Sequence, residues 1–320
     1  LAERGGEDPA LEAAARRDIE TFTLLAELDW DQVLAEVGGK APREYGPVLA
    51  NLPRWRGSSP FSFAELTEFY RANGAGLFAR HRAFLWEDGA LCPVEQPDCP
   101  GADEMLGYEL QRNRVIANTR AMLEGNLVNN VLLYGDSGTG KSATVKNLLT
   151  LPGFEALRLI EVQKEGLADL PRLIRTLGGR RLKFILFIDD LAFDQDDKTY
   201  SALKTILEGG LERRPANVAV YATSNRRRLV RQTFSDRAGD EVDASETIQE
   251  KTSLSDRFGL RIPYLALNQA EFLELVEGMA EQAGIALDRD SLRAEAVKWE
   301  MRNPGRTPRT AKQFIASLSL

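Results

Sequence analysis

Five short runs of apolar residues recur along the middle of the chain, and sequence with helical spacing separates each run from the next. Each run is about five residues long and nearly continuous in apolar character. The runs are residues 131–134, 157–162, 184–188, 218–222 and 260–264. Short, continuously apolar strands that alternate with helices are typical of a parallel sheet covered by helices on both faces. The pattern therefore predicts an α/β fold.

The first hundred residues carry patterns of a different kind. Residues 10–28 place apolar side chains at spacings of three to five, which predicts an amphipathic helix. Residues 62–65 have the form of a capping box that opens a further short helix. Residues 82–91 indicate a β-hairpin, and a proline-rich stretch at 92–101 follows it. We interpret residues 1–100 as an N-terminal appendage, mainly helical with one hairpin, in which no chemical motif is recognisable.

After the last apolar run the strand signal is lost. Helices are predicted from Asn268, over residues 288–299 and over residues 310–318. Helices without a strand predict a small all-helical domain. The expected division of the chain is therefore an α/β core at residues 101–264 and a helical domain at residues 265–320, behind the N-terminal appendage.

Composition narrows the class of protein. The chain has 320 residues, of which 43% are hydrophobic and 28% charged, which is ordinary for a soluble globular protein. A net charge of −7 gives no overall positive field for nucleic acid. No apolar run approaches the ~20 residues that span a bilayer, and the first residues lack the pattern of a signal peptide. We therefore expect a cytoplasmic protein without a membrane segment.

The clusters of charged residues and the cysteines give no clear indication of function. The basic run at residues 226–228, with Arg231, is interpreted as a solvated loop or intersubunit contact in preference to a phosphate-binding patch. Residues 194–197 and 235–250 are expected to form exposed loops. The only cysteines and the single histidine are too few for a four-ligand zinc site within one chain.

A glycine-rich loop follows the first apolar run and precedes a segment with helical spacing. Residues 135–142 read Gly-Asp-Ser-Gly-Thr-Gly-Lys-Ser, and this pattern between a strand and a helix is typical of a phosphate-binding loop. Its backbone N–H groups surround phosphate oxygens. Lys141 is expected to reach the β- and γ-phosphates and Ser142 to bind Mg²⁺. The residues expected to bind ATP or ADP here are Gly135, Asp136, Ser137, Gly138, Thr139, Gly140, Lys141, Ser142 and Ala143.

Polar residues at the ends of later elements complete a candidate site. Asp189 and Asp190 end the run at 184–188, and in P-loop enzymes the first acid at this place holds Mg²⁺. Asp190 is the candidate to orient or deprotonate the attacking water. Asn225 ends the next run, where it would help to position that water. Arg309 opens the last predicted helix, from which it would fold over the triphosphate.

These motifs, in this order, resemble those of the AAA+ ATPases over about residues 103–320. Residues 221–227, 253–260 and 309–314 more narrowly resemble a bacterial AAA+ family of unknown function. The Asp-Arg-Phe-Gly stretch at 256–259 is also similar to that of the Holliday-junction branch-migration motor.

The resemblance implies roles for particular residues. The glycine loop is then Walker A, and Asp189 with Asp190 is Walker B. Asn225 is sensor 1, Arg257 is an arginine finger and Arg309 is sensor 2. The family's adenine pocket maps onto Met105, Leu106, Gly107 and Tyr108. The resemblance also implies a five-stranded parallel sheet in the order 5-1-4-3-2, a C-terminal helical lid, and a homo-oligomer in which Arg257 completes a neighbour's site.

One departure from the family pattern leaves two functions open. Most AAA+ ATPases end Walker B with Asp-Glu, and Asp190 is one methylene shorter, which places its carboxylate roughly 1.5 Å further from the water. A misplacement of ~1 Å can cost on the order of a hundredfold in rate. The first function is an ATPase that couples hydrolysis of Mg·ATP to remodelling of a macromolecule. The second is a slowly hydrolysing, nucleotide-dependent switch, loader or scaffold, with nucleic acid as one partner class.

A third class, the small-molecule kinases with the same loop, is disfavoured. Such a kinase has no need of Asn225, Arg257 and Arg309 in this order. The sequence identifies neither the macromolecular substrate nor the number of subunits.

Overall fold

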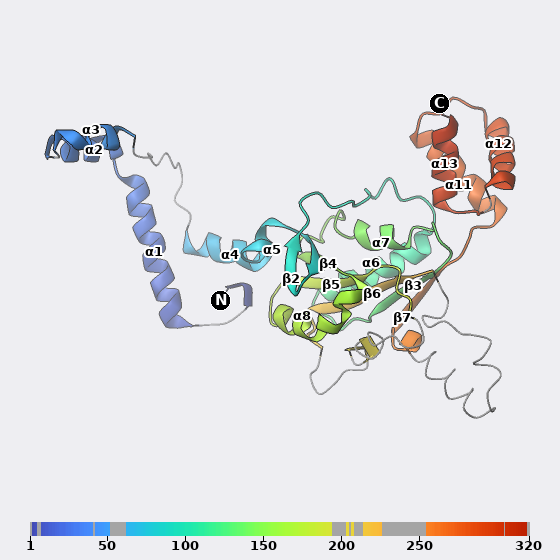
Figure 1. Cartoon of the computed structure of the whole chain (residues 1–320), viewed down its shortest axis with the longest axis horizontal. Helices are drawn as coiled ribbons and strands as arrows, with labels where there is room; N and C mark the ends of the chain where they lie inside the picture. The colour runs from blue at the N-terminus through green and yellow to red at the C-terminus, as the bar shows by residue number, and fades with distance from the viewer. Residues whose placement is uncertain are drawn as a thin grey trace. The chain divides into compact units, whose positions relative to one another are not determined.

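The structure is a computed structural model of the whole chain (Figure 1). The residues that it describes are 2–4, 8–40, 42–51, 62–193, 203–204, 206–207, 214–225, 254–303 and 305–318. The basic run at 226–231, the acidic tract at 194–197 and the polar stretch at 235–250 lie outside the described residues. The chain divides into two compact units, residues 1–75 and residues 76–320.

The first unit is helical. Its elements are η1 (Ala2–Arg4), α1 (Pro9–Glu27), α2 (Trp30–Lys40), η2 (Arg43–Tyr45), α3 (Gly46–Ala50) and α4 (Phe63–Asn73). The carboxylate of Asp8 caps α1 by accepting hydrogen bonds from the N–H groups of Ala10 and Leu11. Ser62 and Glu65 form the predicted capping box of α4. Neither α1 nor α4 has a buried residue, so the apolar side chains of these two amphipathic helices are exposed or only half-buried.

The second unit is built on a seven-stranded sheet with the order β2-β1-β4-β5-β6-β3-β7. Its strands are β1 (Ala83–Glu87), β2 (Ala90–Pro93), β3 (Val131–Gly135), β4 (Leu157–Val162), β5 (Lys183–Ile188), β6 (Val218–Ser224) and β7 (Leu260–Tyr264). Strands β3 to β7 are the five that the apolar runs predict, and they pair in parallel. Their order, β7-β3-β6-β5-β4, is the 5-1-4-3-2 arrangement implied by the AAA+ resemblance, so this part of the prediction is confirmed.

The predicted hairpin adds two strands to the expected five. β1 pairs with β2 in antiparallel fashion and with β4 in parallel, with Phe84 opposite Ile160. Phe84 and Trp86 are buried in the same core cluster as Ile160. The hairpin joins the sheet because burying these two aromatic side chains requires the neighbouring strand. The expectation of a five-stranded sheet is therefore corrected to seven, and residues 76–100, expected in the appendage, lie in the second unit.

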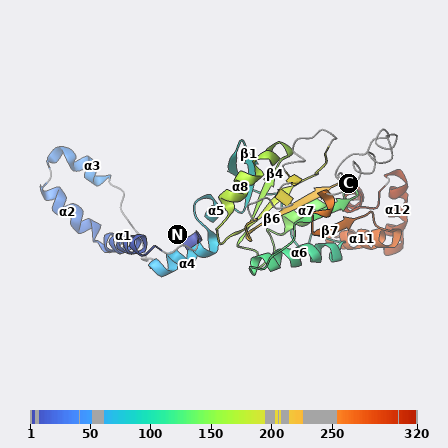
Figure 2. The same ribbon diagram turned by 90° about the horizontal axis from the view of Figure 1, so that it is seen from below.

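Helices cover both faces of the sheet. They are α5 (Leu77–Arg80), α6 (Glu109–Leu123), α7 (Lys141–Asn147), η3 (Lys164–Asp169) and α8 (Leu170–Leu177). α6 and α8 lie on opposite sides of the strands (Figure 2). Successive residues of β3 enter different cores, because Leu132 packs with α8 whereas Val131 and Leu133 pack with α6 and α7. Burial on both faces explains why these strands are continuously apolar in sequence.

The C-terminal helices form the predicted helical lid, drawn in orange and red in Figure 1. They are α11 (Gln269–Gln282), α12 (Arg289–Arg302) and α13 (Pro308–Leu318). Asn268 begins α11 in a capping box with Glu271, and Asp288 caps α12. Phe272, Ala296 and Phe314, one from each helix, meet in a core separate from those of the sheet. Among the described helices, none has the length and apolar character needed to cross a membrane.

Candidate nucleotide-binding site

The glycine loop lies at the carboxyl end of β3. Gly135 has a φ of 138° and lies so close to β7 that a Cβ atom there would be 2.1 Å from the carbonyl oxygen of Tyr264. Only glycine can occupy such a position. The loop continues to Gly140, and α7 begins at Lys141. The close packing against β7 therefore fixes where the loop starts.

Lys141 points back into the loop that precedes it. Its side chain is buried, and its Nζ donates hydrogen bonds to the carbonyl oxygens of Gly135 (3.1 Å) and Asp136 (2.7 Å) and to Oδ1 of Asn225 (2.9 Å). Burial lowers the pKa of Lys141, and nearby carboxylates, first that of Asp136, oppose this shift. The three acceptors are formally neutral, so the charge of the ammonium group is available to a phosphate.

Ser142 and Asp189 meet as a pair of oxygen ligands. The Ser142 hydroxyl donates to Oδ1 of Asp189 at 2.6 Å. Hydroxyl and carboxylate oxygens, together with phosphates, are what Mg²⁺ uses in such sites. Within the described part of the chain, no group of three or more acidic, histidine or cysteine side chains suits a metal ion. The pair at Ser142 and Asp189 thus fits a Mg²⁺ ion that takes most of its ligands from phosphate and water.

Asp190 is held in an unusual backbone conformation. Its φ is 49°, in the left-handed region that non-glycine residues rarely adopt. Its N–H donates to the hydroxyl oxygen of Thr223 at 2.9 Å, and that hydroxyl also contacts Asp189. The carboxylate of Asp190 accepts a hydrogen bond from Nδ2 of Asn225 at 2.8 Å. The ends of β5 and β6 therefore fix the direction of both acids.

The lid reaches the glycine loop at the first turn of α13. The N–H of Arg309 donates to the carbonyl oxygen of Gly138 at 3.2 Å, and its Nη1 to Oγ of Ser137 at 3.4 Å. Gly138 has a φ of 78°, and a Cβ atom there would lie 3.0 Å from Cβ of Arg309. The guanidinium group of Arg309 is thereby placed beside the loop.

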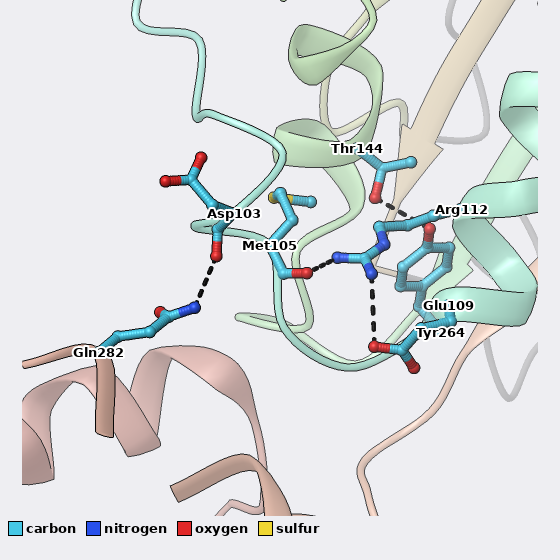
Figure 3. Close-up of polar contacts among 7 residues, drawn as sticks. All are labelled: Asp103, Met105, Glu109, Arg112, Thr144, Tyr264 and Gln282. Carbon is cyan, nitrogen blue, oxygen red and sulfur yellow. Dashed lines mark hydrogen bonds and ion pairs between the residues drawn. The ribbon is translucent and has the colours of Figure 1, made fainter. Parts of the chain in front are cut away.

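The residues expected to form the adenine pocket lie on a loop that is hydrogen-bonded to both the core and the lid (Figure 3). Arg112, on α6, donates to the carbonyl oxygen of Met105 and to the carboxylate of Glu109. From the lid, Nε2 of Gln282 donates to the carbonyl oxygen of Asp103 at 2.7 Å. These bonds hold the loop between its two neighbours.

An aromatic pair closes the same side of the site. The ring of Tyr108 stacks on that of Tyr264, with centroids 5.0 Å apart. The hydroxyl of Tyr264 shares a hydrogen bond of 2.9 Å with Thr144 of α7 (Figure 3). Burial raises the pKa of Tyr264 to about 12, so both tyrosines are neutral near pH 7. The pair forms a flat, uncharged wall.

One cavity of about 670 Å³ unites these groups. That volume lies within the range of small-molecule sites, roughly 300–1,000 Å³. The predicted residues that line it are Met105, Leu106, Gly107, Tyr108, Ser137, Gly138, Thr139, Gly140, Lys141, Ser142, Ala143, Asp189, Asp190, Asn225 and Arg309. Gly135 and Asp136, at the start of the loop, are not in the lining.

The lining also includes residues that the sequence interpretation missed. They are Asp98, Glu104, Arg112, Thr144, Thr223, Tyr264, Met279, Pro308, Lys312 and Gln313. Helical spacing alone points to two of them, because Lys312 and Gln313 follow Arg309 by three and four residues and so share its face of α13. Arg112 carries no comparable signal.

Arg257 lies away from this cavity. It lies three residues before Leu260, the first residue of β7, which pairs with Val131 at the start of β3. The glycine loop follows the other end of β3. Arg257 is thus at the amino ends of the strands, whereas its own chain's candidate site is at their carboxyl ends.

A family model described as "Protein of unknown function (DUF815)" matches residues 79–319, which is more than half of the chain. No curated protein matches the chain.

The chain is also similar to solved structures, of which two are described here. Thermotoga maritima RuvB, described as a Holliday junction branch migration motor, is 17% identical with a TM-score of 0.43, over 69% of this chain and 63% of that one. A mutant of the same RuvB is 15% identical with a TM-score of 0.44, over 69% and 64%. The chain therefore spans less than two thirds of the length of these structures.

Family and fold can now be stated together. The strand order, the glycine loop between β3 and α7, and the lid behind β7 are observed directly. The strand order is the one that the AAA+ resemblance implies, and the chain belongs to the family described as proteins of unknown function, DUF815.

Proposed function

We propose that the protein binds Mg·ATP in the cavity between the sheet and the lid and hydrolyses it. The observation that carries this proposal is the meeting of Lys141, the Ser142–Asp189 pair and the Asn225–Asp190 pair at one end of one cavity. Phosphoryl transfer depends mainly on positioning and on electrostatic stabilisation of charged oxygens. These side chains provide a cation, ligands for a divalent ion and a carboxylate for water.

Each residue has a part in this proposed reaction. Lys141 exchanges its carbonyl acceptors for the β- and γ-phosphate oxygens. Ser142 and Asp189 would hold Mg²⁺, which neutralises charge on those phosphates when it is bound. Asp190 orients the attacking water and accepts its proton, and Asn225 fixes the carboxylate of Asp190. Arg309 adds positive charge from the lid side.

The proposed site is completed by a second subunit. The position of Arg257, at the opposite ends of the strands from its own loop, supports its action on a neighbour's γ-phosphate in a homo-oligomer. Hydrolysis in such an assembly would be coupled to remodelling of a macromolecule in the cytoplasm. The net charge of −7 gives no support to nucleic acid as that macromolecule.

A second candidate function is favoured by the environment of Asp190. Its carboxylate is one methylene shorter than the usual glutamate, and Asn225 holds it through a hydrogen bond of 2.8 Å. Both features slow the activation of water. In this reading the protein is a nucleotide-dependent switch, loader or scaffold, and binding of nucleotide, not turnover, carries its function.

Calorimetry with Mg·ATP and an assay of phosphate release test the proposal. The variant Lys141→Ala is expected to weaken binding at least tenfold, because a charge-assisted hydrogen bond contributes about 1.5–3 kcal/mol. Lys146→Ala, five residues further along α7 and outside the cavity lining, is the matched control and should bind as the wild type does. Wild-type affinity in Lys141→Ala would remove the lysine from this role. Tight binding with negligible phosphate release in the assembled wild type would favour the switch.

A further inference from the structure

Asp136 places a negative charge inside a loop that is expected to bind an anion. Its side chain is exposed and immediately follows Gly135. A carboxylate at this place repels an incoming phosphate, since like charges a few ångströms apart interact unfavourably. Asp136 is also the first of the carboxylates that oppose the effect of burial on Lys141. The structure shows what this otherwise unfavourable residue contacts.

The carboxylate of Asp136 is bonded to the connection between the sheet and the lid. Its Oδ2 accepts a hydrogen bond of 2.6 Å from the N–H of Ala266. Its own N–H donates to the carbonyl oxygen of Tyr264 at 2.9 Å. Its carbonyl oxygen accepts from Nζ of Lys141 at 2.7 Å. One residue thus contacts the loop lysine through its backbone and the connection to the lid through its side chain.

In the connection, residues 264–267, the two middle residues are held mainly by such polar contacts. Leu265 and Ala266 are exposed, so little apolar packing fixes them. The carbonyl oxygen of Leu265 accepts from the hydroxyl of Tyr108 at 2.5 Å, and the N–H of Leu267 donates to the carbonyl oxygen of Arg306 at 2.9 Å. Two bonds join this segment, hereafter the hinge, to Asp136 of the glycine loop: the backbone bond at Tyr264 and the bond from the N–H of Ala266 to the carboxylate.

We propose that Asp136 is a positioning residue that sets the angle of the lid according to the state of the glycine loop. A hydrogen bond to a charged acceptor is about twice as strong as one between neutral groups, so this bond restrains the hinge effectively. When Lys141 turns to a phosphate, it releases the carbonyl oxygen of Asp136. The carbonyl oxygen then keeps one side-chain donor, the hydroxyl of Thr139 at 2.8 Å, so the peptide is held less tightly. The carboxylate on the same residue carries the resulting shift to Ala266.

The proposal has two parts, and only the second depends on nucleotide binding. The restraint of the hinge by Asp136 concerns the protein without nucleotide. The response to phosphate rests on the proposed function, because it requires that nucleotide binds at Lys141. An experiment that measures the lid position both with and without nucleotide separates the two.

The position of the lid is measured as a distance between spin labels. Leu127, before β3, and Met301, on α12, have exposed fractions of 70% and 81% and are replaced by cysteine for labelling. Cys92 and Cys99 are first replaced by serine. Pulsed electron resonance then gives the distribution of distances in the wild-type background and in each variant.

Two substitutions of Asp136 differ only in the acceptor. Asp136→Asn retains an oxygen for the N–H of Ala266, whereas Asp136→Ala has none. Without nucleotide, we expect a narrow distribution for the wild type and Asp136→Asn and a clearly broader one for Asp136→Ala. Ala266→Pro removes the same bond from the donor side and is expected to broaden the distribution in the same way. Asp98→Ala removes a carboxylate from the cavity wall without altering the hinge bonds, so it should match the wild type.

Addition of ADP tests whether the position of the lid responds to phosphate at the glycine loop. ADP should shift the wild-type distribution and have a much smaller effect on Asp136→Ala. The proposal is overturned if, without nucleotide, Asp136→Ala and Ala266→Pro both give the wild-type distribution. If calorimetry finds no binding of ADP to the wild type, the proposed function fails, while the comparison without nucleotide still decides the role of Asp136.

Discussion

The side-chain amide of Asn225 connects Lys141 with Asp190. Its Oδ1 accepts from Nζ of Lys141 at 2.9 Å, and its Nδ2 donates to Oδ1 of Asp190 at 2.8 Å. This orientation of the amide follows from its partners, because an ammonium group can only donate and an ionised carboxylate can only accept. A phosphate that draws Lys141 away from Asn225 therefore changes the surroundings of the residue that we assign to the attacking water.

Removal of this amide should affect turnover more than binding. We expect Asn225→Ala to lower the rate of ATP hydrolysis roughly a hundredfold, a loss typical of removing one fixed donor near a reacting group. The affinity for ATP should change only a few-fold, because Lys141, which is proposed to bind the phosphates, is retained. Steady-state phosphate release and a nucleotide titration measure the two effects. An equal loss in Asn126→Ala, an exposed asparagine outside the site, would show that the effect is not specific.

Asp190→Asn should preserve nucleotide affinity and reduce hydrolysis. Asparagine tolerates the left-handed backbone conformation at this position about as well as aspartate does, so the fold around it is retained. An amide, however, cannot accept a proton from water at neutral pH. Asp190→Glu is the companion variant, and restored reach should raise its turnover if the short side chain limits the rate. Unchanged hydrolysis in Asp190→Asn would point to a different base.

Arg257 is expected to act on a neighbouring subunit. Arg257→Ala subunits, which have an intact glycine loop, and Lys141→Ala subunits, which have an intact arginine, should each be inactive alone and active when mixed. An arginine supplied in this way contributes roughly 10³–10⁵ in rate in GTPases. Phosphate release across a range of mixing ratios measures the recovery. Wild-type hydrolysis by Arg257→Ala at all protein concentrations would contradict the assignment.

The stability of the lid should depend on pH through the ionisation of Glu277. Hydrogen bonds from Arg289 and Arg293 lower the pKa of Glu277 from 4.5 to about 2. Because the folded pKa is the lower one, the stabilisation is fully present above about pH 4.5 and is lost as pH falls toward 2.

Melting curves of Glu277→Gln against the wild type test this dependence. The variant should melt at a lower temperature at pH 7, and the difference should narrow as the pH is lowered below 4.5. Glu295→Gln breaks an exposed pair with Lys298 on the same lid and should shift the melting temperature less. A difference in melting temperature that stays constant between pH 7 and pH 3 would contradict the assignment of this pH dependence to Glu277.

The strands of the sheet were predictable where burial on both faces requires apolar residues at nearly every position. β4, β5 and β6 are covered on both faces, so each gives a nearly continuous apolar run whose ends match the observed strands closely. The hairpin was predictable as a hairpin, but not as part of the sheet. Its partner, β4, lies more than 60 residues further along the chain, and four or five residues carry no signal that identifies such a partner. The strand order came from the family resemblance and not from any spacing.

The candidate site divides in the same manner. Lys141, Ser142, Asp189 and Asp190 belong to contiguous motifs at strand ends, which local sequence reveals. Arg112 enters the cavity from a helix without such a motif. The bond between Asp136 and Ala266 joins residues 130 positions apart, and only the folded backbone brings them together.

The hairpin also decides where this chain can be shortened. β2 is the outermost strand beside β1, has four residues and ends at Pro93, whose missing N–H limits further pairing. A protein that began at residue 101 would lose both strands and present β4, with its largely buried apolar surface, as an unprotected edge. Such an edge recruits strands from other molecules, so that shortened protein should aggregate during expression. Starting at residue 76 keeps the edge covered and offers the better route to an isolated second unit.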